Sequence, residues 1–572
     1  MAVESGESVV RATVANAARL VEIEGQPLAV NVAAQLDCIT VVDDLHLPDS
    51  FILDFRDPAH DILVRSGIDL RKRIKISAGS LYSDAPSVLI DGEVTSVGCE
   101  NDESGAHTIV RGYDLSHRLN VGTNSRVFQN VTYSDIAREI AGKAGLEDGV
   151  EATQQVHEYV IQVNETDWEF LQRLAADEGV DCRVDGDTLL FKPAPSATDG
   201  PALGSIASTK GTELVWGTTL RRFDARLAAA AQVAEVQVNG WDPVKKEAVV
   251  GKAPVTATHA ALEMKPADLA GFFGSKTLYI TNAAIKTQEA ADALAKAKAE
   301  QAGGAGYEAT AVCAGSAELR AGSTISVAGV NKPLTGQWSV SSTRHTIKNG
   351  EYQTVAECSG KQDRSLTGLV SKLSGSAGSR QKFYGVAVGI VTNNLDPERV
   401  ARVKVKFPWF DDQLESNWAR VASLGAGKNH GLAFIPQVGD EVLVAFEHGD
   451  MRFPVVLGGL WNGVDKPPID QDDSPLGKKS PFDAGTVRRS GIVSRGGHRV
   501  VFHDAPDDAG IAIISSNEKF QVTLNETTNE LQIVSPGKVV IQANELEIKV
   551  DANASIKAGG QLTLKGSTVN IN

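Results

Sequence analysis

The sequence predicts a mainly β protein with a few helices, made of a long N-terminal β-rich region, a small barrel and a repetitive C-terminal rod. Three observations predict this architecture. Gly is frequent (54 of 572 residues) and aromatic residues are scarce (6%), which suits many short strands and turns. Alternating apolar and polar residues, punctuated by turn residues, fill most of the chain. The end of the chain repeats a strand-and-turn unit.

The N-terminal region, residues 1–360, contains alternating strands interrupted by helices with start and stop signals. The strongest helix has a capping box formed by Thr166 and Glu169 and ends at Gly179. The other two are expected from about Ser134 to Gly142, and from Thr287 to Gly303-Gly304. Tight hairpins are predicted at Asp185-Gly186 and Asn349-Gly350.

The remaining boundaries follow composition. Residues 361–381 are Gly/Ser-rich and read as a linker. Residues 382–464 hold six strand-like runs, one of them at 430–436, close to the five strands of a Greek-key barrel of the OB type. Residues 465–489 form a second, Pro- and Asp-rich linker, and residues 490–572 a β-helix rod whose octad repeats cover 531–572.

The repeats place pairs of apolar residues two positions apart, so that both members share one face of a strand. Successive pairs are offset by seven or eight residues. One chain would wind these six units into only two coils, which is too few to be stable, whereas three chains would make six coils of a three-sided prism. The sequence therefore favours a homotrimer, with an ordinary antiparallel sheet as the alternative.

The predicted trimer core consists of the apolar residues that face the threefold axis. They are Leu531, Ile533, Val539, Ile541, Leu546, Ile548, Ile556, Leu562, Leu564, Val569 and Ile571, with Ala554 at the twelfth position. Lys549, Lys557 and Lys565 follow inward residues at intervals of eight and should form a solvated outer ladder.

Composition argues against several functions. The net charge of −16 disfavours binding to nucleic acid or anionic membranes by bulk charge. The five cysteines are widely spaced and contain no CxxC, which indicates neither a disulfide framework nor a zinc ribbon. The start "MAVESGESVV" lacks the features of a signal peptide, so we expect synthesis in the bacterial cytoplasm.

Motifs for catalysis or cofactor binding are weak. The segment "GAGKNH" (residues 425–430) imitates a phosphate loop, but Ala422 and Asn429 occupy positions where Gly and Ser or Thr are needed, so a polar loop is expected. His498 and His503 are too far apart for a ligand pair on one strand. We predict no catalytic residues, no metal site and no cofactor. Trp409, in "FPW", either stacks on a ligand or fixes chains together, and we favour the latter.

Several long segments carry a family resemblance. The segments "NNLDPERVARVKVKFPWF", "NWARVAS", "IPQVGDEVLVAFEHGDMRFPVVLGGLWNG" and "RGGHRVVFHDA" resemble the OB-fold and spike-entry parts of VgrG proteins and of central spikes of contractile phage tails and extracellular injection systems. "VRGYDLSHRL" and "ETDWEFLQRLAADEGV" resemble the hub part of the same family. The resemblance spans nearly the whole chain.

The resemblance implies a non-enzymatic homotrimeric spike at the tip of a contractile injection system. Its hub, residues 1–360, would meet inner tube and baseplate proteins, and its needle would pierce the target membrane mechanically. Effector cargo is a further implied partner, and the N-terminal start favours an extracellular particle. The alternatives are a type VI VgrG carrying effectors, a tail-associated enzyme that degrades the cell envelope, and an adhesin.

The resemblance also implies a PAAR-type protein that sharpens the tip. A prism that ends bluntly leaves unpaired backbone groups at its rim, which a cap satisfies by strand addition. The predicted cap-binding residues are Ser567, Thr568, Val569, Asn570, Ile571 and Asn572.

Overall fold

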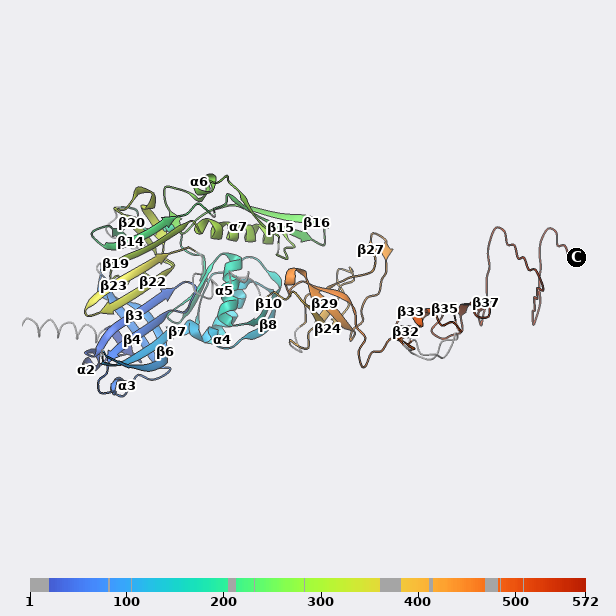
Figure 1. Ribbon diagram of the computed structural model, residues 1–572, viewed down its shortest axis with the longest axis horizontal. Coiled ribbons are helices and arrows are strands. Elements are labelled where there is room, and N and C mark those ends of the chain that lie inside the picture. Colours follow the sequence, from blue (N-terminus) through green and yellow to red (C-terminus); the bar gives the residue numbers. More distant parts are fainter. Residues whose placement is uncertain are drawn as a thin grey trace, which may run out of the picture. The chain divides into compact units, whose positions relative to one another are not determined.

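The computed structural model describes residues 20–80, 83–103, 105–203, 212–230, 232–281, 283–360, 382–410, 415–468, 482–483, 485–507 and 509–571. The chain divides into two compact units, Met1–Leu460 and Trp461–Asn572. The expected linker at 361–381 and most of the central part of the linker at 465–489 lie outside the described residues. The expectation of a mainly β protein is confirmed (Figure 1).

The first unit is organised around an antiparallel sheet of eleven strands. One half is assembled from the start of the chain and the other from residues after 219, and they join where β22 pairs with β3. In spatial order the strands are β14 (Leu220–Leu227), β19 (Tyr307–Ala314), β23 (Glu351–Cys358), β22 (Ser342–Lys348), β3 (Leu36–Asp44), β4 (Ser50–Arg56), β7 (Gly105–Asp114), β6 (Ser83–Asp102), β5 (Arg73–Ser80), β1 (Val21–Ile23) and β2 (Gln26–Pro27). The short helices α2 (Val30–Ala33) and α3 (Ile62–Ser66) belong to the first half.

The turn predicted at Asn349-Gly350 is confirmed. It joins β22 to β23 with both residues at positive φ (52° and 80°), as a two-residue hairpin turn requires. Trp338 is fully buried in the core beneath the second half of the sheet.

A helical lobe lies between the two halves in the sequence. The helices α4 (Tyr133–Ala144) and α5 (Asp167–Glu178) pack side by side (Figure 1), against β8 (Asn124–Val131) and β10 (His157–Glu165) and against β9 (Glu147–Val150), β11 (Asp181–Asp185) and β12 (Thr188–Lys192). The capping box of α5 is confirmed, since the Thr166 side chain accepts from the Glu169 backbone and the Glu169 carboxylate accepts in return. Gly179 ends the helix at φ 80°.

Two predicted boundaries shift. The α4 helix begins one residue earlier than predicted, because Thr132 and Asp135 form a second capping box, and ends two residues later, before Gly145 in the left-handed conformation. The hairpin after α5 turns at Gly186 and Asp187, one residue later than predicted, because Asp185 still pairs with Thr188.

The Ala-rich helix predicted after Thr287 is confirmed as α7 (Gln288–Gly304), with Thr287 as its N-cap. It covers the small sheet of β15 (Glu235–Asp242), β16 (Glu247–Pro254) and β18 (Thr277–Ile280). The backbones approach closely there, because a Cβ on Gly251 would stand 2.3 Å from the Ala291 carbonyl. Nearby lie α6 (Pro266–Gly271) and the four-stranded sheet of β13 (Thr212–Val215), β20 (Thr324–Ala328), β21 (Gly336–Ser339) and β17 (Ala260–Ala261).

The small barrel contains a five-stranded sheet in the order β25 (Lys404–Lys406), β24 (Val386–Asn393), β29 (Glu441–Phe446), β30 (Pro454–Gly459) and β26 (Arg420–Val421). The prediction of a barrel strand at 430–436 is wrong. Only His430–Gly431 (β28) is a strand, and it pairs with Ala426–Gly427 (β27) rather than with the barrel sheet. The rest of this apolar segment is not part of a strand in the described structure.

The second unit contains a five-stranded antiparallel meander formed by β33 (Arg489–Val493), β34 (Arg499–His503), β35 (Gly510–Ile514), β36 (Gln521–Asn525) and β37 (Glu530–Val534). A two-residue hairpin of β31 (Phe482–Asp483) and β32 (Thr486–Val487) precedes it. Residues 535–571, all of which the structure describes, form neither strand nor helix in the single chain.

A buried carboxyl cluster holds the end of β3 against the loop that carries Arg320. Asp43 accepts from the Arg320 guanidinium and from the Ala321 backbone, while Asp49 lies 3.9 Å from the same guanidinium. Asp114 is 4% exposed. Burial, and to a lesser degree the charge of Asp43, raise the pKa of Asp114 to about 7. Burial and the neighbouring carboxylates likewise raise the pKa of Asp49.

This cluster predicts an unusual pH dependence of hub stability. Because the pKa of Asp114 is higher in the folded state (about 7) than its ordinary value of 3.8, the folded protein binds the proton more tightly. The contribution of this group to stability is therefore fully present below about pH 4 and is lost as the pH rises to 7, by up to about 4 kcal/mol. Asp114→Asn keeps an oxygen that accepts from the Ser116 hydroxyl and should flatten this decline.

The measurement is urea unfolding followed by tryptophan fluorescence at pH 5 and pH 8. Asp69→Asn, at an exposed aspartate, is the matched control and should retain the wild-type pH dependence. Equal pH dependence in the Asp114→Asn variant and the wild type would contradict the assignment.

Candidate assembly face

The register of the meander in the second unit gathers its apolar side chains on one face. Directly paired residues of an antiparallel sheet point to the same side. Two rows of paired residues therefore share this face. The first row contains Phe502, Ile511, Leu524 and Leu531, and the second contains Ile492, Val500, Ile513, Val522 and Ile533.

This apolar face is not covered within the described part of the chain. Ile513 is 51% exposed, Phe502 42% and Leu531 64%. Soluble monomers rarely leave so large a continuous apolar surface in water. We call these two rows, together with the inward repeat residues that follow them, the rod face.

The opposite side of the meander is better buried. Val501, Ala512 and Ile514 are at most 3% exposed. His503 lies beside Arg489 on neighbouring strands, and burial together with the guanidinium lowers the pKa of His503 to about 4. The imidazole is thus neutral at physiological pH, which fits the structural role expected for it.

The structure places the predicted trimer-core residues in two settings. Leu531 and Ile533 lie on the edge strand β37, where they complete the two rows. The others lie in the segment that forms no strand in the single chain, and every one that is apolar and large is more than half exposed. Those residues are Val539, Ile541, Leu546, Ile548, Ile556, Leu562, Leu564, Val569 and Ile571.

The single chain does not bring these later residues together, so their assignment to a trimer core stays a prediction. Of the predicted cap-binding residues, Ser567 to Ile571 are exposed and Asn572 lies outside the described residues.

Sequence reasoning missed the earlier part of the rod face. Its residues also come in pairs two positions apart, Val500/Phe502, Ile511/Ile513 and Val522/Leu524. Their offsets are eleven, eleven and then nine to Leu531/Ile533, so a search for octads passes over them. The spacing of two residues within each pair is the sequence signal that could have identified this part of the rod face.

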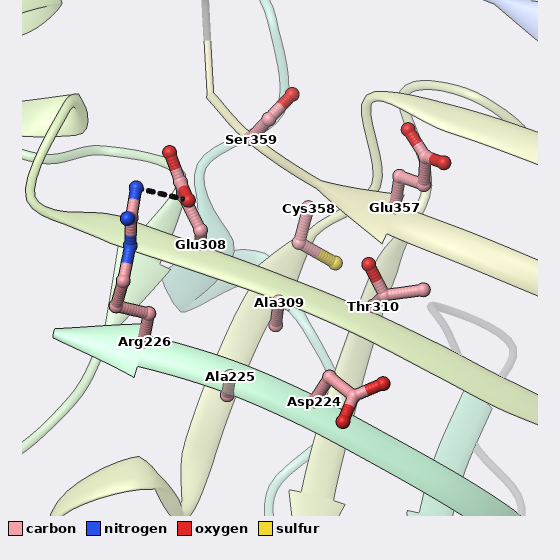
Figure 2. Close-up of a pocket in the computed structure, with 9 residues that line it drawn as sticks. All are labelled: Asp224, Ala225, Arg226, Glu308, Ala309, Thr310, Glu357, Cys358 and Ser359. Atoms are coloured by element: carbon pink, nitrogen blue, oxygen red, sulfur yellow. Dashed lines mark hydrogen bonds and ion pairs between the residues drawn. The ribbon is translucent and has the colours of Figure 1, made fainter.

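A hollow in the hub offers a different kind of surface. Figure 2 shows it on the open face of β14, β19 and β23, with Arg226 paired to Glu308 at 2.6 Å between neighbouring strands. Cys358 lines it, but burial raises the pKa of its thiol, so little nucleophilic thiolate forms. The hollow is therefore a groove on the polar surface of the sheet, and its thiol is poorly suited to act as a nucleophile.

Metal and membrane features were also sought among the described residues. In the described ranges, no group of three His, Cys, Asp or Glu side chains is placed to hold a metal ion. None of the described helices has the length and apolar character needed to span a membrane.

Curated relatives match about 60% of the chain in sequence. The chain is 26% identical over 381 residues to the actin cross-linking toxin VgrG1 of Vibrio cholerae, and 24% identical over 371 residues to the type VI secretion system spike protein VgrG1b of Pseudomonas aeruginosa. Each match covers 61% of this chain, but only 33% and 48% of those proteins. The chain thus spans between a third and a half of the length of these relatives.

Two family models and one solved structure also match the chain. The "type VI secretion system/phage-baseplate injector OB domain" model matches residues 387–461, and the "Alg8 N-terminal domain" model matches residues 65–349. A Francisella PdpA–VgrG complex has a similar fold, with a TM-score of 0.51 at 8% identity over 88% of this chain and 84% of that one. With the hub and barrel geometry described above, these matches show that the chain is similar to VgrG spike proteins over about 60% of its length and has an injector-type OB domain at residues 387–461.

Proposed function

We propose that the chain is a homotrimeric, non-enzymatic spike at the tip of a contractile injection system. The observation that carries the proposal is the rod face, which runs from Ile492 to Ile571 and stays uncovered in the single chain. Three copies bury it around one axis, since the repeat count is too small for a stable coil of one chain. The resemblance of the hub and the OB barrel to VgrG proteins supports the assignment of this trimer to a baseplate.

The function is mechanical. A prism with a continuous apolar axis and no free sheet edges resists axial load, and the energy of penetration comes from the contraction of a sheath. The curated Pseudomonas relative is named as a spike protein, which supports a structural role. The Vibrio relative is named as a toxin, but this chain matches only 33% of its length.

The partners follow from the same reasoning. Inner tube and baseplate proteins would meet the hub, and a PAAR-type protein would cap the tip. Effector cargo is supported by the solved complex, in which a VgrG is bound to PdpA. The particle that carries this spike is proposed to be an extracellular, phage-tail-like one, assembled from protein made in the cytoplasm.

The first test places a charge on the proposed axis. Ile548→Asp would bring three carboxylates together on the axis of the trimer, at a cost of several kcal/mol each unless they are protonated. We expect the trimer to dissociate at nanomolar concentration in mass photometry. Lys549→Asp adds the same carboxylate on the outer side of the same strand and should leave the trimer intact. A stable Ile548→Asp trimer would show that the inward face is misassigned.

A second test asks whether the rod face begins at the meander. Ile513→Asp lies in one of its two apolar rows, whereas Gln532→Asp lies on the opposite side of the sheet. Burial of an unpaired carboxyl should weaken the trimer by at least about 2 kcal/mol per chain, in the first variant alone. Light scattering after size exclusion in increasing urea measures this difference. Identical dissociation midpoints would confine the trimer contact to the octad repeats.

A third test concerns the tip. Deletion of residues 567–572 removes the inward Val569 and Ile571 but leaves the other trimer-core positions, so the trimer should persist. Binding of a PAAR-type tip protein should be lost, because the strand ends that it extends are gone. The measurement is a pull-down with the tagged tip protein, with Lys565→Ala as a control near the tip. Unchanged affinity after the deletion would refute this cap site.

A further inference from the structure

Parts of three strands of the OB barrel, β24, β29 and β30, are apolar on both sides, although only one side faces the barrel core. In β24, Ala387 and Val391 point inward and are at most 6% exposed. Val386 and Val388 alternate with them and point outward, at 53% and 42% exposure. Strands with two apolar sides are typical of sheets that are covered on both faces.

The register extends this outer surface across three strands. Val386 pairs with Ala445, which pairs with Val455, and Val388 pairs with Leu443. Leu457 lies on β30 at the point where the pairing of β29 and β30 shifts register. Its side chain is 46% exposed and extends the same surface. We call this surface the outer OB face; it consists of Val386, Val388, Leu443, Ala445, Val455 and Leu457.

An aromatic side chain extends the outer OB face at one edge. The Trp409 indole N–H donates to the Val388 carbonyl at 3.1 Å, and the residue is 52% exposed. Trp409 also stacks on Phe383, with 5.7 Å between the ring centroids. Its ring is thus held in place while much of its surface remains open to a partner.

The same domain contains an apolar segment whose side chains are exposed to solvent. Residues 423–438, here called the arm, leave the barrel after the backbone bond from Ala422 to Val456 and return at the bond from Gly439 to Val391. Between these points the chain extends away from the sheet as the β27–β28 hairpin (Figure 1). Residues 426–435 are exposed without interruption.

The arm is shaped by its own backbone rather than by packing. The Ser423 hydroxyl donates to the Leu432 carbonyl at 2.6 Å, and the Leu432 N–H donates to the Gly425 carbonyl at 3.0 Å. The segment that imitated a phosphate loop is simply the turn of this hairpin. Its apolar side chains lie open to solvent, namely Leu424 (97% exposed), Leu432 (45%), Phe434 (54%), Ile435 (42%) and Val438 (57%).

We propose that the arm of one copy packs on the outer OB face of a neighbouring copy. The inference rests on the proposed trimer and adds a second contact between its chains, separate from the rod face. Each copy then supplies one arm and receives one, a head-to-tail contact that closes into a ring of three. The arm contributes Phe434 and Ile435 to a surface formed by Val388, Leu457 and Trp409.

A second copy is the occupant for two reasons. The domain offers both halves of the contact, an exposed apolar surface and an exposed apolar arm, and neither is covered by the described residues of its own chain. In addition, the barrel is tethered to a rod that three copies share in the proposed assembly, which holds the neighbouring barrels at high effective concentration. Continuity with the rod face therefore favours another copy over a foreign protein.

The test uses cross-linking between full-length chains. Two differently tagged chains are co-expressed, one with Phe434→Cys in the arm and one with Val388→Cys on the outer OB face, with the exposed Cys99 changed to Ser in both. A short bismaleimide should join them into a doubly tagged dimer. The matched control replaces Val388→Cys by Val64→Cys on helix α3, which is 86% exposed. We expect at least a fivefold higher yield for the arm–face pair.

Mass photometry of the unmodified protein separates the possible failures. Absence of a trimer would overturn the proposed function. A trimer in which the arm–face pair gives no more product than the control would overturn the arm contact alone. A chain that carries both cysteines and is cross-linked only within itself would show that the arm folds onto its own barrel, which also refutes the proposal.

Discussion

The structure depends on an apolar surface that one chain cannot bury. From the meander onward, most strand-length segments of the rod face present two large apolar side chains on one side, and the single chain leaves many of them exposed to water. Burial of apolar area contributes roughly 25 cal/mol per Å², so burial of the rod face would be the main further source of stability for the protein. In the proposed trimer, folding of the rod and association of the chains are therefore one process.

Dependence on a partner increases along the chain. The hub closes its own cores, in which Trp338, Phe170 and Phe55 are almost completely buried. The OB barrel closes its inside but leaves the outer OB face and the arm open. The rod has almost no interior of its own, since only Ala512 and Ile514 form a buried cluster in the described part of the second unit. The hub can thus fold first and present the later parts for assembly.

Sequence reasoning succeeded where the signals are local. The capping box at Thr166, the N-cap at Thr287 and the turn at Asn349-Gly350 each act within a few residues, and each is confirmed. Prediction from the sequence failed where the structure of a segment depends on residues that are distant in the sequence. The apolar segment at 430–436 looks like a barrel strand, yet its first residues pair with Ala426–Gly427 in a local hairpin and not with the barrel sheet. The Asp43–Arg320 pair joins positions far apart in the sequence, and no periodicity could reveal it. The boundaries of the predicted linkers remain predictions.

The distribution of ionisable groups separates assembly from hub stability. The rod face contains only aliphatic side chains and Phe502, so no group on it changes protonation when the trimer forms. Its contribution to stability is then independent of pH, because a pH dependence requires a difference in bound protons between the two states. In the hub, by contrast, the pKa of Asp114 is raised to about 7 within a buried cluster. A mildly acidic medium therefore favours the protonated carboxyl of Asp114 in the hub, whereas the side chains of the rod face carry no titratable group.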